Sequence, residues 1–149
     1  MSLTIDSQGC VSPASSEAQA TLAQVLSKWN EAAADWDVER LAGMYTPDAL
    51  MFGGLSGHSV GRGGMRDYFG AYADRLAGAN LTLTDQYIVA LGLEAYIAQG
   101  FGTFRFELIG GRRTSTTMRT SLLLERRANQ WRIRQHHFSA IPVKPPIDD

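Results

Sequence analysis

The sequence predicts an α+β fold in which helices come first and an antiparallel sheet comes last. Apolar residues recur at three- and four-residue steps over the first half of the chain, which is the period of an amphipathic helix. After Asn80 the chain changes to long segments rich in β-branched and aromatic residues, separated by short turns. Because such turns are too short for crossover connections, neighbouring strands should form antiparallel hairpins.

Two longer helices are expected in the first half. One begins near Ser16 and extends to the last residue of a stripe of apolar side chains. That stripe consists of Ala18, Leu22, Val25, Leu26, Trp29, Ala33 and Trp36. The other follows Gly61 and should end near Gly78. Its apolar side carries Met65, Tyr68, Phe69, Tyr72 and Leu76.

A short helix and a strand are expected between these two helices. Asp37 can cap the short helix, which should carry Tyr45 near its end. The turn residues 46–48 should terminate it, because proline and aspartate favour turns there. A strand over 49–52 and a glycine-rich loop over 53–58 should follow.

Four strands are expected in the second half, over residues 81–91, 95–109, 115–127 and 130–141. The last two are joined by a turn at 128–129. If that turn has an even length, it pairs Leu124 with Ile133 and Thr120 with His137. A turn of odd length would pair these residues with different partners.

The composition indicates one globular domain over residues 17–142, with an arm over 1–16 and a tail over 143–149. The chain has 149 residues, of which 44% are hydrophobic, and a formal net charge of −1. The absence of a basic excess argues against a nucleic-acid partner. No segment has the apolar length of a membrane helix or the layout of a signal peptide, so we expect a soluble, cytoplasmic protein without membrane contact.

No metal site and no cofactor are expected. Cys10 is the only cysteine, so a thiolate cluster cannot form. The three histidines lack carboxylates at metal-ligand spacing. The glycines around Gly53 and Gly61 lack the lysine of a phosphate-binding loop.

His137 is the strongest candidate for a catalytic residue. It follows His136 directly, and neighbouring residues of a strand point to opposite faces of the sheet. The predicted register places His137 on the core face with Ile133, at a polar end that includes Thr120 and Ser139. A histidine there can act as a general acid or base. Alternatively it is a buried histidine that is merely hydrogen-bonded, and if the register differs, His136 takes its place.

The ligand-binding wall is expected to combine apolar and hydroxyl side chains. Phe52 and Phe101 would supply apolar surface, and Tyr45 could offer its hydroxyl group, although a helical tyrosine is often a core residue. Thr120 and Ser139 would lie beside the histidine. No metal is part of this predicted site.

Several segments resemble the NTF2-like superfamily, in particular its SnoaL-like and ketosteroid-isomerase-like branch and the association domain of calcium/calmodulin-dependent kinase II. The similarity covers roughly residues 17–142. It lies in the long first helix, Asp37 before Leu41, the segment 44–49, Gly61-Arg62, and Trp131 followed by residues 137–139. This resemblance implies a cone, with a strongly curved antiparallel sheet wrapped around three N-terminal helices, a pocket inside and frequent dimerisation through the outer sheet face.

The resulting functional hypothesis is an NTF2-like protein that binds a small, largely apolar molecule, with a carbonyl or a carboxylate group. As an enzyme it would be an isomerase, cyclase or lyase with His137 as general acid or base. Arg105 or Arg119 could pair with a carboxylate. Steroid isomerisation is not expected, because the segment 49–52 carries no carboxylate base. The alternative is a non-catalytic dimerisation module with a vestigial pocket.

A homodimer is expected in either case. One face of the last strand combines charged and aromatic side chains, as partner-binding sheet faces often do. These residues are Arg132, Arg134, His136 and Phe138.

Overall fold

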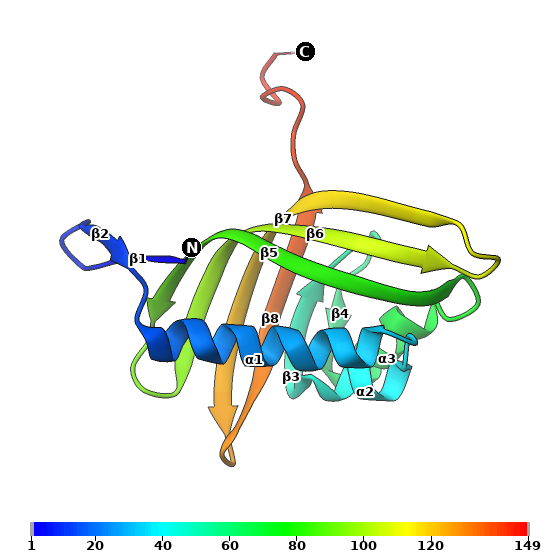
Figure 1. The fold of residues 1–149 in the computed structure, drawn as a ribbon, viewed down its shortest axis with the longest axis horizontal. Coiled ribbons are helices and arrows are strands. Elements are labelled where there is room, and N and C mark those ends of the chain that lie inside the picture. The colour runs from blue at the N-terminus through cyan, green and yellow to red at the C-terminus, as the bar shows by residue number, and fades with distance from the viewer. Residues whose placement is uncertain (1, 149) are drawn as a thin grey trace.

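The computed structural model describes residues 2–148 and confirms the predicted α+β architecture, with helices packed against one face of a curved sheet (Figure 1). The helices of this part of the chain are α1 (Ser16–Ala33), α2 (Val38–Gly43) and α3 (Gly61–Gly70). The strands are β1 (Leu3–Ile5), β2 (Val11–Pro13), β3 (Tyr45–Phe52), β4 (Ser59–Val60), β5 (Leu76–Ala90), β6 (Ala95–Leu108), β7 (Arg113–Arg127) and β8 (Gln130–Ala140). They form one sheet in the order β2-β1-β5-β6-β7-β8-β3-β4.

Both predicted helix starts in the first forty residues are confirmed by capping hydrogen bonds. The Ala18 backbone N–H donates to the Ser15 hydroxyl over 3.1 Å, which satisfies one free N–H of α1. The Arg40 backbone N–H likewise donates to the Asp37 carboxylate at the start of α2. The apolar stripe of α1 then packs into the core, where Trp29 is fully buried.

The third helix is shorter than predicted, because the chain enters the sheet early. α3 ends at Gly70, a series of turns follows, and β5 already begins at Leu76. A Cβ at Gly78 would collide with the backbone carbonyl of Ala34, next to the end of α1. Gly78 is therefore the point where β5 passes close to α1, and not the end of a helix.

The four long strands pair as the predicted antiparallel hairpins, whereas two shorter pairings are parallel. β5, β6, β7 and β8 are antiparallel neighbours. β3 runs parallel to β8, and β1 meets β5 in parallel at Leu3 and Tyr87. In each parallel pair the two strands lie far apart in the sequence, so no hairpin turn determines how they pair. The β1–β2 hairpin of the N-terminal arm was not predicted.

The prediction of a helix end at Tyr45 and a turn at 46–48 is wrong, because these residues form the first half of β3. Tyr45 pairs with Ile133, but the next paired residue on β3 is Leu50, opposite Gln135. The residues between them bulge out of the ladder, which accommodates the turn-forming proline within a strand.

A second bulge, at Arg134 of β8, overturns the predicted register at the functional end of the sheet. The two-residue turn is confirmed, with positive φ at both Ala128 and Asn129, and Leu124 pairs with Ile133 as predicted. Beyond that pair, Leu123 faces Gln135, so Arg134 is an extra residue in the ladder.

The Arg134 bulge inverts the faces of all residues that follow it in β8. The predicted pairing of Thr120 with His137 is wrong, since Thr120 pairs with Phe138. His136 is 1% exposed and lies on the inner face, whereas His137 is exposed. A one-residue shift has this effect because side chains alternate along a strand.

Candidate functional site

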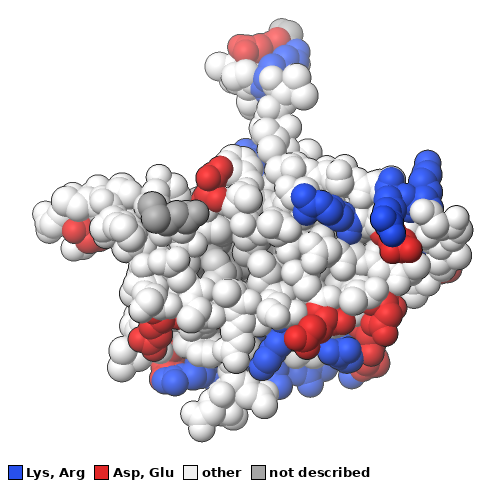
Figure 2. Space-filling view, in the orientation of Figure 1, with Lys and Arg blue, Asp and Glu red and all other residues white. Residues whose placement is uncertain are grey.

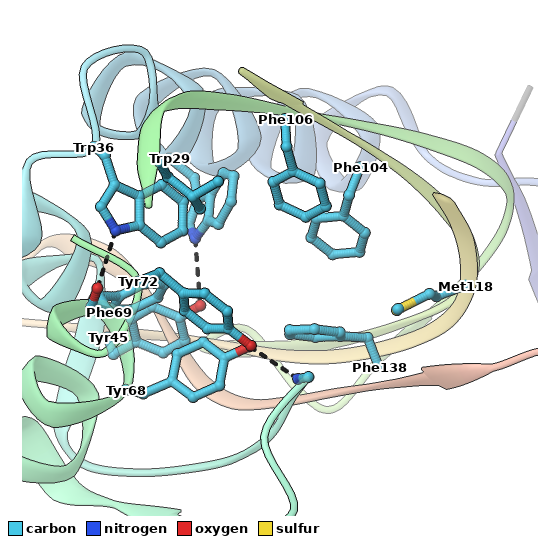
Figure 3. Close-up of a pocket in the computed structure, with 12 residues that line it drawn as sticks. Trp29, Trp36, Tyr45, Tyr68, Phe69, Tyr72, Phe104, Phe106, Met118 and Phe138 are labelled. Carbon is cyan, nitrogen blue, oxygen red and sulfur yellow. Dashed lines mark hydrogen bonds between the residues drawn. The ribbon is translucent and has the colours of Figure 1, made fainter. Parts of the chain in front are cut away.

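An apolar cavity of about 190 Å³ lies between the helices and the inner face of the sheet (Figure 3). Aromatic side chains make up most of its wall. It is lined by Trp29, Trp36, Tyr45, Gly54, Tyr68, Phe69, Tyr72, Leu76, Phe104, Phe106, Met118 and Phe138. Among the described residues, none of these lining side chains carries a charge.

Helical and sheet elements contribute opposite walls of this cavity. Trp29 comes from α1, and Tyr68 and Phe69 come from α3. Phe104 and Phe106 alternate along β6 and therefore point to the same face, where their rings are stacked 6.1 Å apart. Figure 3 shows the two groups of rings facing one another across the cavity, with Met118 and Phe138 on the sheet side.

A buried polar pair adjoins the cavity, with Tyr45 in the wall and His136 behind it. The Tyr45 hydroxyl is 3.0 Å from His136 Nδ1, and the two rings are stacked. The Trp29 indole N–H donates to the same hydroxyl over 3.3 Å. All three side chains are buried, so these hydrogen bonds are formed in a region of low dielectric.

Burial keeps both members of the pair uncharged at neutral pH. It lowers the pKa of His136 to about 3, with a smaller contribution from the neighbouring charge of His137. Burial also raises the pKa of the Tyr45 hydroxyl, which the Trp29 hydrogen bond opposes weakly. A neutral imidazole has one donor and one acceptor nitrogen, and His136 Nε2 has no partner in the described part of the chain. Through the Tyr45 hydroxyl, the pair can therefore orient a neutral polar group.

The loop after β3 closes one side of the cavity on the tips of two tyrosines. The Gly54 backbone N–H donates to the Tyr68 hydroxyl over 2.9 Å. A Cβ at Gly53 would collide with the Tyr68 hydroxyl and lie 2.8 Å from Phe138 Cζ. At Gly54 it would lie 2.8 Å from the Tyr72 hydroxyl. Glycine at both positions thus lets the backbone itself form this wall.

The residues predicted to form one site are divided between the two faces of the sheet. Tyr45 lies inside, at the cavity wall. Phe52 is 44% exposed on the outer face, where its ring lies 5.6 Å from that of His137. Phe101 and Ser139 line a shallow groove on the same outer face, together with His137. The predicted pocket position of these four residues is wrong, because the Arg134 bulge reverses β8 and because residues 101 and 52 alternate outward.

Thr120 is on the inner face, as predicted, but beside different residues. It is buried and pairs with Phe138, and its hydroxyl has no hydrogen-bond partner among residues 2–148. The prediction that β8 presents its arginines together with His136 and Phe138 on one dimer face is also wrong. His136 and Phe138 point inward, and the bulge separates them from the outward-facing arginines.

The residues of the observed cavity that sequence reasoning missed are mainly aromatic. Phe104 and Phe106 alternate in the sequence, and this period-two signal was available to place them on one face. His136 was identified as the substitute for His137 if the register changed. Trp36 could not be assigned to the cavity, because it follows the end of α1 with a positive φ of 51°.

No helix in the described part of the chain has the length and apolar character needed to cross a membrane.

Comparison with solved structures places the fold among NTF2-like proteins. A protein from Xanthomonas campestris, provisionally named a calcium/calmodulin-dependent protein kinase II association domain, is 22% identical with a TM-score of 0.75, covering 83% of this chain and 87% of its own. An NTF2-like superfamily protein from Salmonella enterica is 20% identical with a TM-score of 0.72, covering 91% and 99%. A protein from Novosphingobium aromaticivorans, provisionally named a scytalone dehydratase, is 9% identical with a TM-score of 0.73, covering 83% and 84%.

Sequence comparison gives the same assignment. Among curated proteins no significant match was found. The SnoaL-like domain family, however, matches residues 22–144. This range includes β3, β6 and β8, the strands that contribute aromatic side chains to the cavity. The fold is that of NTF2-like proteins, and the chain belongs to the SnoaL-like domain family.

Proposed function

We propose that this protein binds a small, largely apolar ring compound in the inner cavity, with the Tyr45–His136 pair as its polar contact. The observation that carries the proposal is the aromatic cavity with Tyr45 in its wall, where the Tyr45 hydroxyl is held by the buried His136 behind it. A cavity of about 150 Å³ holds benzene, and sites for drug-sized ligands begin near 300 Å³. A volume of about 190 Å³ therefore suits one ring with a short substituent.

The chemistry of the cavity favours a neutral polar group on that ring. A charged carboxylate would lose its hydration inside without gaining a cation, which is strongly unfavourable. A carbonyl or hydroxyl group needs one or two hydrogen bonds. The Tyr45 hydroxyl, in the cavity wall, can supply one of them.

If the ligand is turned over, Tyr45 would hold its carbonyl group by a hydrogen bond, with His136 positioning the hydroxyl. Burial makes the imidazole a weak base and the phenol a weak acid, because it lowers the pKa of His136 to about 3 and raises the pKa of Tyr45. A hydrogen bond to a carbonyl group assists reactions that move a proton at the neighbouring carbon, as many isomerases, cyclases and lyases do. The scytalone dehydratase name of one structural relative belongs to the lyase class. His136 thus replaces His137 as the histidine of the site, in a positioning role.

Acetophenone and ethylbenzene provide a matched test of this proposal, because they differ mainly in the carbonyl group. Calorimetry should show both compounds binding to the wild-type protein. Tyr45→Phe should weaken acetophenone about fivefold and leave ethylbenzene almost unchanged, because a single hydrogen bond contributes about 1 kcal/mol. Tyr87→Phe, on the exposed outer face, is the control and should change neither affinity. Failure of both compounds to bind the wild type would refute the proposal.

The outer sheet face supports a second function, self-association. Its strand register places Phe52, His137, Ser121, Gln99 and Tyr87 side by side across β3, β8, β7, β6 and β5. Leu50, Phe52, Tyr87 and Ile97 remain at least one third exposed there. A band of exposed apolar and polar side chains on an outer sheet face suits a second copy of the chain, and we propose a homodimer through it.

A further inference from the structure

A second hollow adjoins the inner cavity and differs from it in charge. It has a volume of about 270 Å³ and shares Tyr72, Leu76 and Phe106 with the cavity. The rest of its wall consists of Arg75, Leu108, Arg112 and Thr114. We call this hollow the vestibule. Because three residues belong to both walls, the two arginines line a hollow that directly adjoins the cavity.

Backbone hydrogen bonds bring the two arginines to the same end of β6. The Ile109 N–H donates to the Arg75 carbonyl over 2.9 Å, and the Leu108 N–H donates to the Arg112 carbonyl over 2.8 Å. Arg75 comes from the segment before β5 and Arg112 from the β6–β7 turn. Their positions are therefore fixed by the sheet, while their side chains remain exposed.

Neither vestibule guanidinium has a carboxylate partner among residues 2–148. Most other arginines do: Arg113, next in the chain to Arg112, pairs with Glu107, and Arg126 pairs with Glu94. Figure 2 shows Lys and Arg side chains gathered at the end of the sheet where β6 and β7 are joined. The vestibule thus holds two positive charges that no described acidic side chain neutralises.

We infer that the natural ligand is an aryl carboxylate, with its ring in the inner cavity and its carboxylate group between Arg75 and Arg112 in the vestibule. This inference rests on the proposed function and specifies its ligand. An uncharged aromatic wall and an adjoining pair of free guanidinium groups match the two ends of such a molecule. Guanidinium groups bind carboxylates by charge-assisted hydrogen bonds with well-defined geometry. The arginines expected to do this from the sequence, Arg105 and Arg119, bond to Thr82 and Ser139 instead.

The test compares 4-phenylbutyrate with 4-phenylbutanol, which has a similar length and no charge. Calorimetry at neutral pH and low salt should show both compounds binding to the wild-type protein. The double variant Arg75→Ala/Arg112→Ala should weaken 4-phenylbutyrate by about tenfold or more and 4-phenylbutanol by less than about twofold. Added sodium chloride should weaken the carboxylate selectively, because exposed ion pairs are screened.

A second double variant, Arg40→Ala/Arg66→Ala, is the matched control. It removes the same charge from α2 and α3, where neither arginine lines the cavity or the vestibule, and it should leave both affinities unchanged. If 4-phenylbutyrate is weakened equally by the two double variants, or by neither, the inference is overturned while the proposed function stands. If 4-phenylbutanol does not bind the wild type, the proposed function fails and the inference fails with it.

Discussion

Tyr45 and His136 are joined in the core although they are 91 residues apart in the sequence. Their burial has an energetic consequence that can be measured apart from any ligand. A neutral histidine in the folded state and a titrating histidine in the unfolded state make the free energy of unfolding depend on pH.

The predicted pH dependence follows from the sign of this difference. The pKa of His136 is about 3 in the folded state and near 6.5 when exposed, so the unfolded chain binds the proton first as the pH falls. The free energy of unfolding is therefore at its full value above about pH 6.5. Below this pH it falls by roughly 1 kcal/mol per pH unit, because the unfolded chain gains a proton that the folded chain does not bind. Urea denaturation at pH 7 and pH 5 should therefore show a loss of about 2 kcal/mol.

Two histidine variants separate this effect from general acid destabilisation. His136→Asn should reduce the dependence of unfolding free energy on pH between 7 and 5. His137→Asn should retain it, because His137 is exposed. An equal pH dependence in the wild type and His136→Asn would show that His136 does not titrate as described.

At the scale of the elements, irregularities in the strands determine which residues face the cavity. β5 contains a bulge at Asp85, which has a positive φ of 52°, and Gly100 of β6 lies opposite it. A Cβ at Gly100 would collide with the Asp85 carbonyl and lie 2.8 Å from the Thr84 carbonyl. The close approach of two backbones, which bends the sheet, thus requires glycine at this position.

Gly100→Ala should destabilise the protein by about 2 kcal/mol, in the range observed for overpacked sites, because backbone atoms must move to admit the methyl group. Gly57→Ala is the control, since a Cβ there meets no atom within 4 Å. Chemical denaturation of both variants gives the comparison. Equal stabilities would show that β5 and β6 do not approach as closely as described.

The elements also show how far the sequence could predict the structure. Hydrophobic period and turn residues were sufficient for α1, the β7–β8 turn and the pairing of Leu124 with Ile133, because these depend on local chemistry. The bulge at Arg134 does not depend on local chemistry. Its guanidinium donates to the Asp48 carbonyl over 2.6 Å, across 86 residues of sequence, and this contact exists only after β3 has joined β8. The exchange of His137 for His136 follows from this bulge, which lies where β8 meets a strand distant in the sequence.

At the scale of the whole molecule, we propose a separate task for each face of the sheet. The inner face would hold the ligand, and the outer face would mediate self-association. His137, Phe52 and Phe101 belong to the outer face and would lie at or near a dimer interface.

Light scattering at micromolar concentration should give a mass twice the 16.3 kDa of the chain. Phe52→Glu should shift this mass to that of the monomer, because a charge would be buried in the interface. Leu93→Glu, at a position 85% exposed in the β5–β6 turn, should leave the dimer intact. A monomeric wild type would remove this proposal and leave the cavity unaffected.

The central claim is that a ring compound occupies the inner cavity, and the three tryptophans allow it to be tested directly. Trp29 and Trp36 line the cavity, whereas Trp131 stacks on Tyr96 and is not part of its wall. Their indole N–H signals can be followed by ¹H–¹⁵N NMR during titration with acetophenone. We predict that the Trp29 and Trp36 signals shift with a common saturation curve and that the Trp131 signal does not move. Unchanged Trp29 and Trp36 signals, together with shifts confined to the outer groove at His137 and Ser139, would contradict the account.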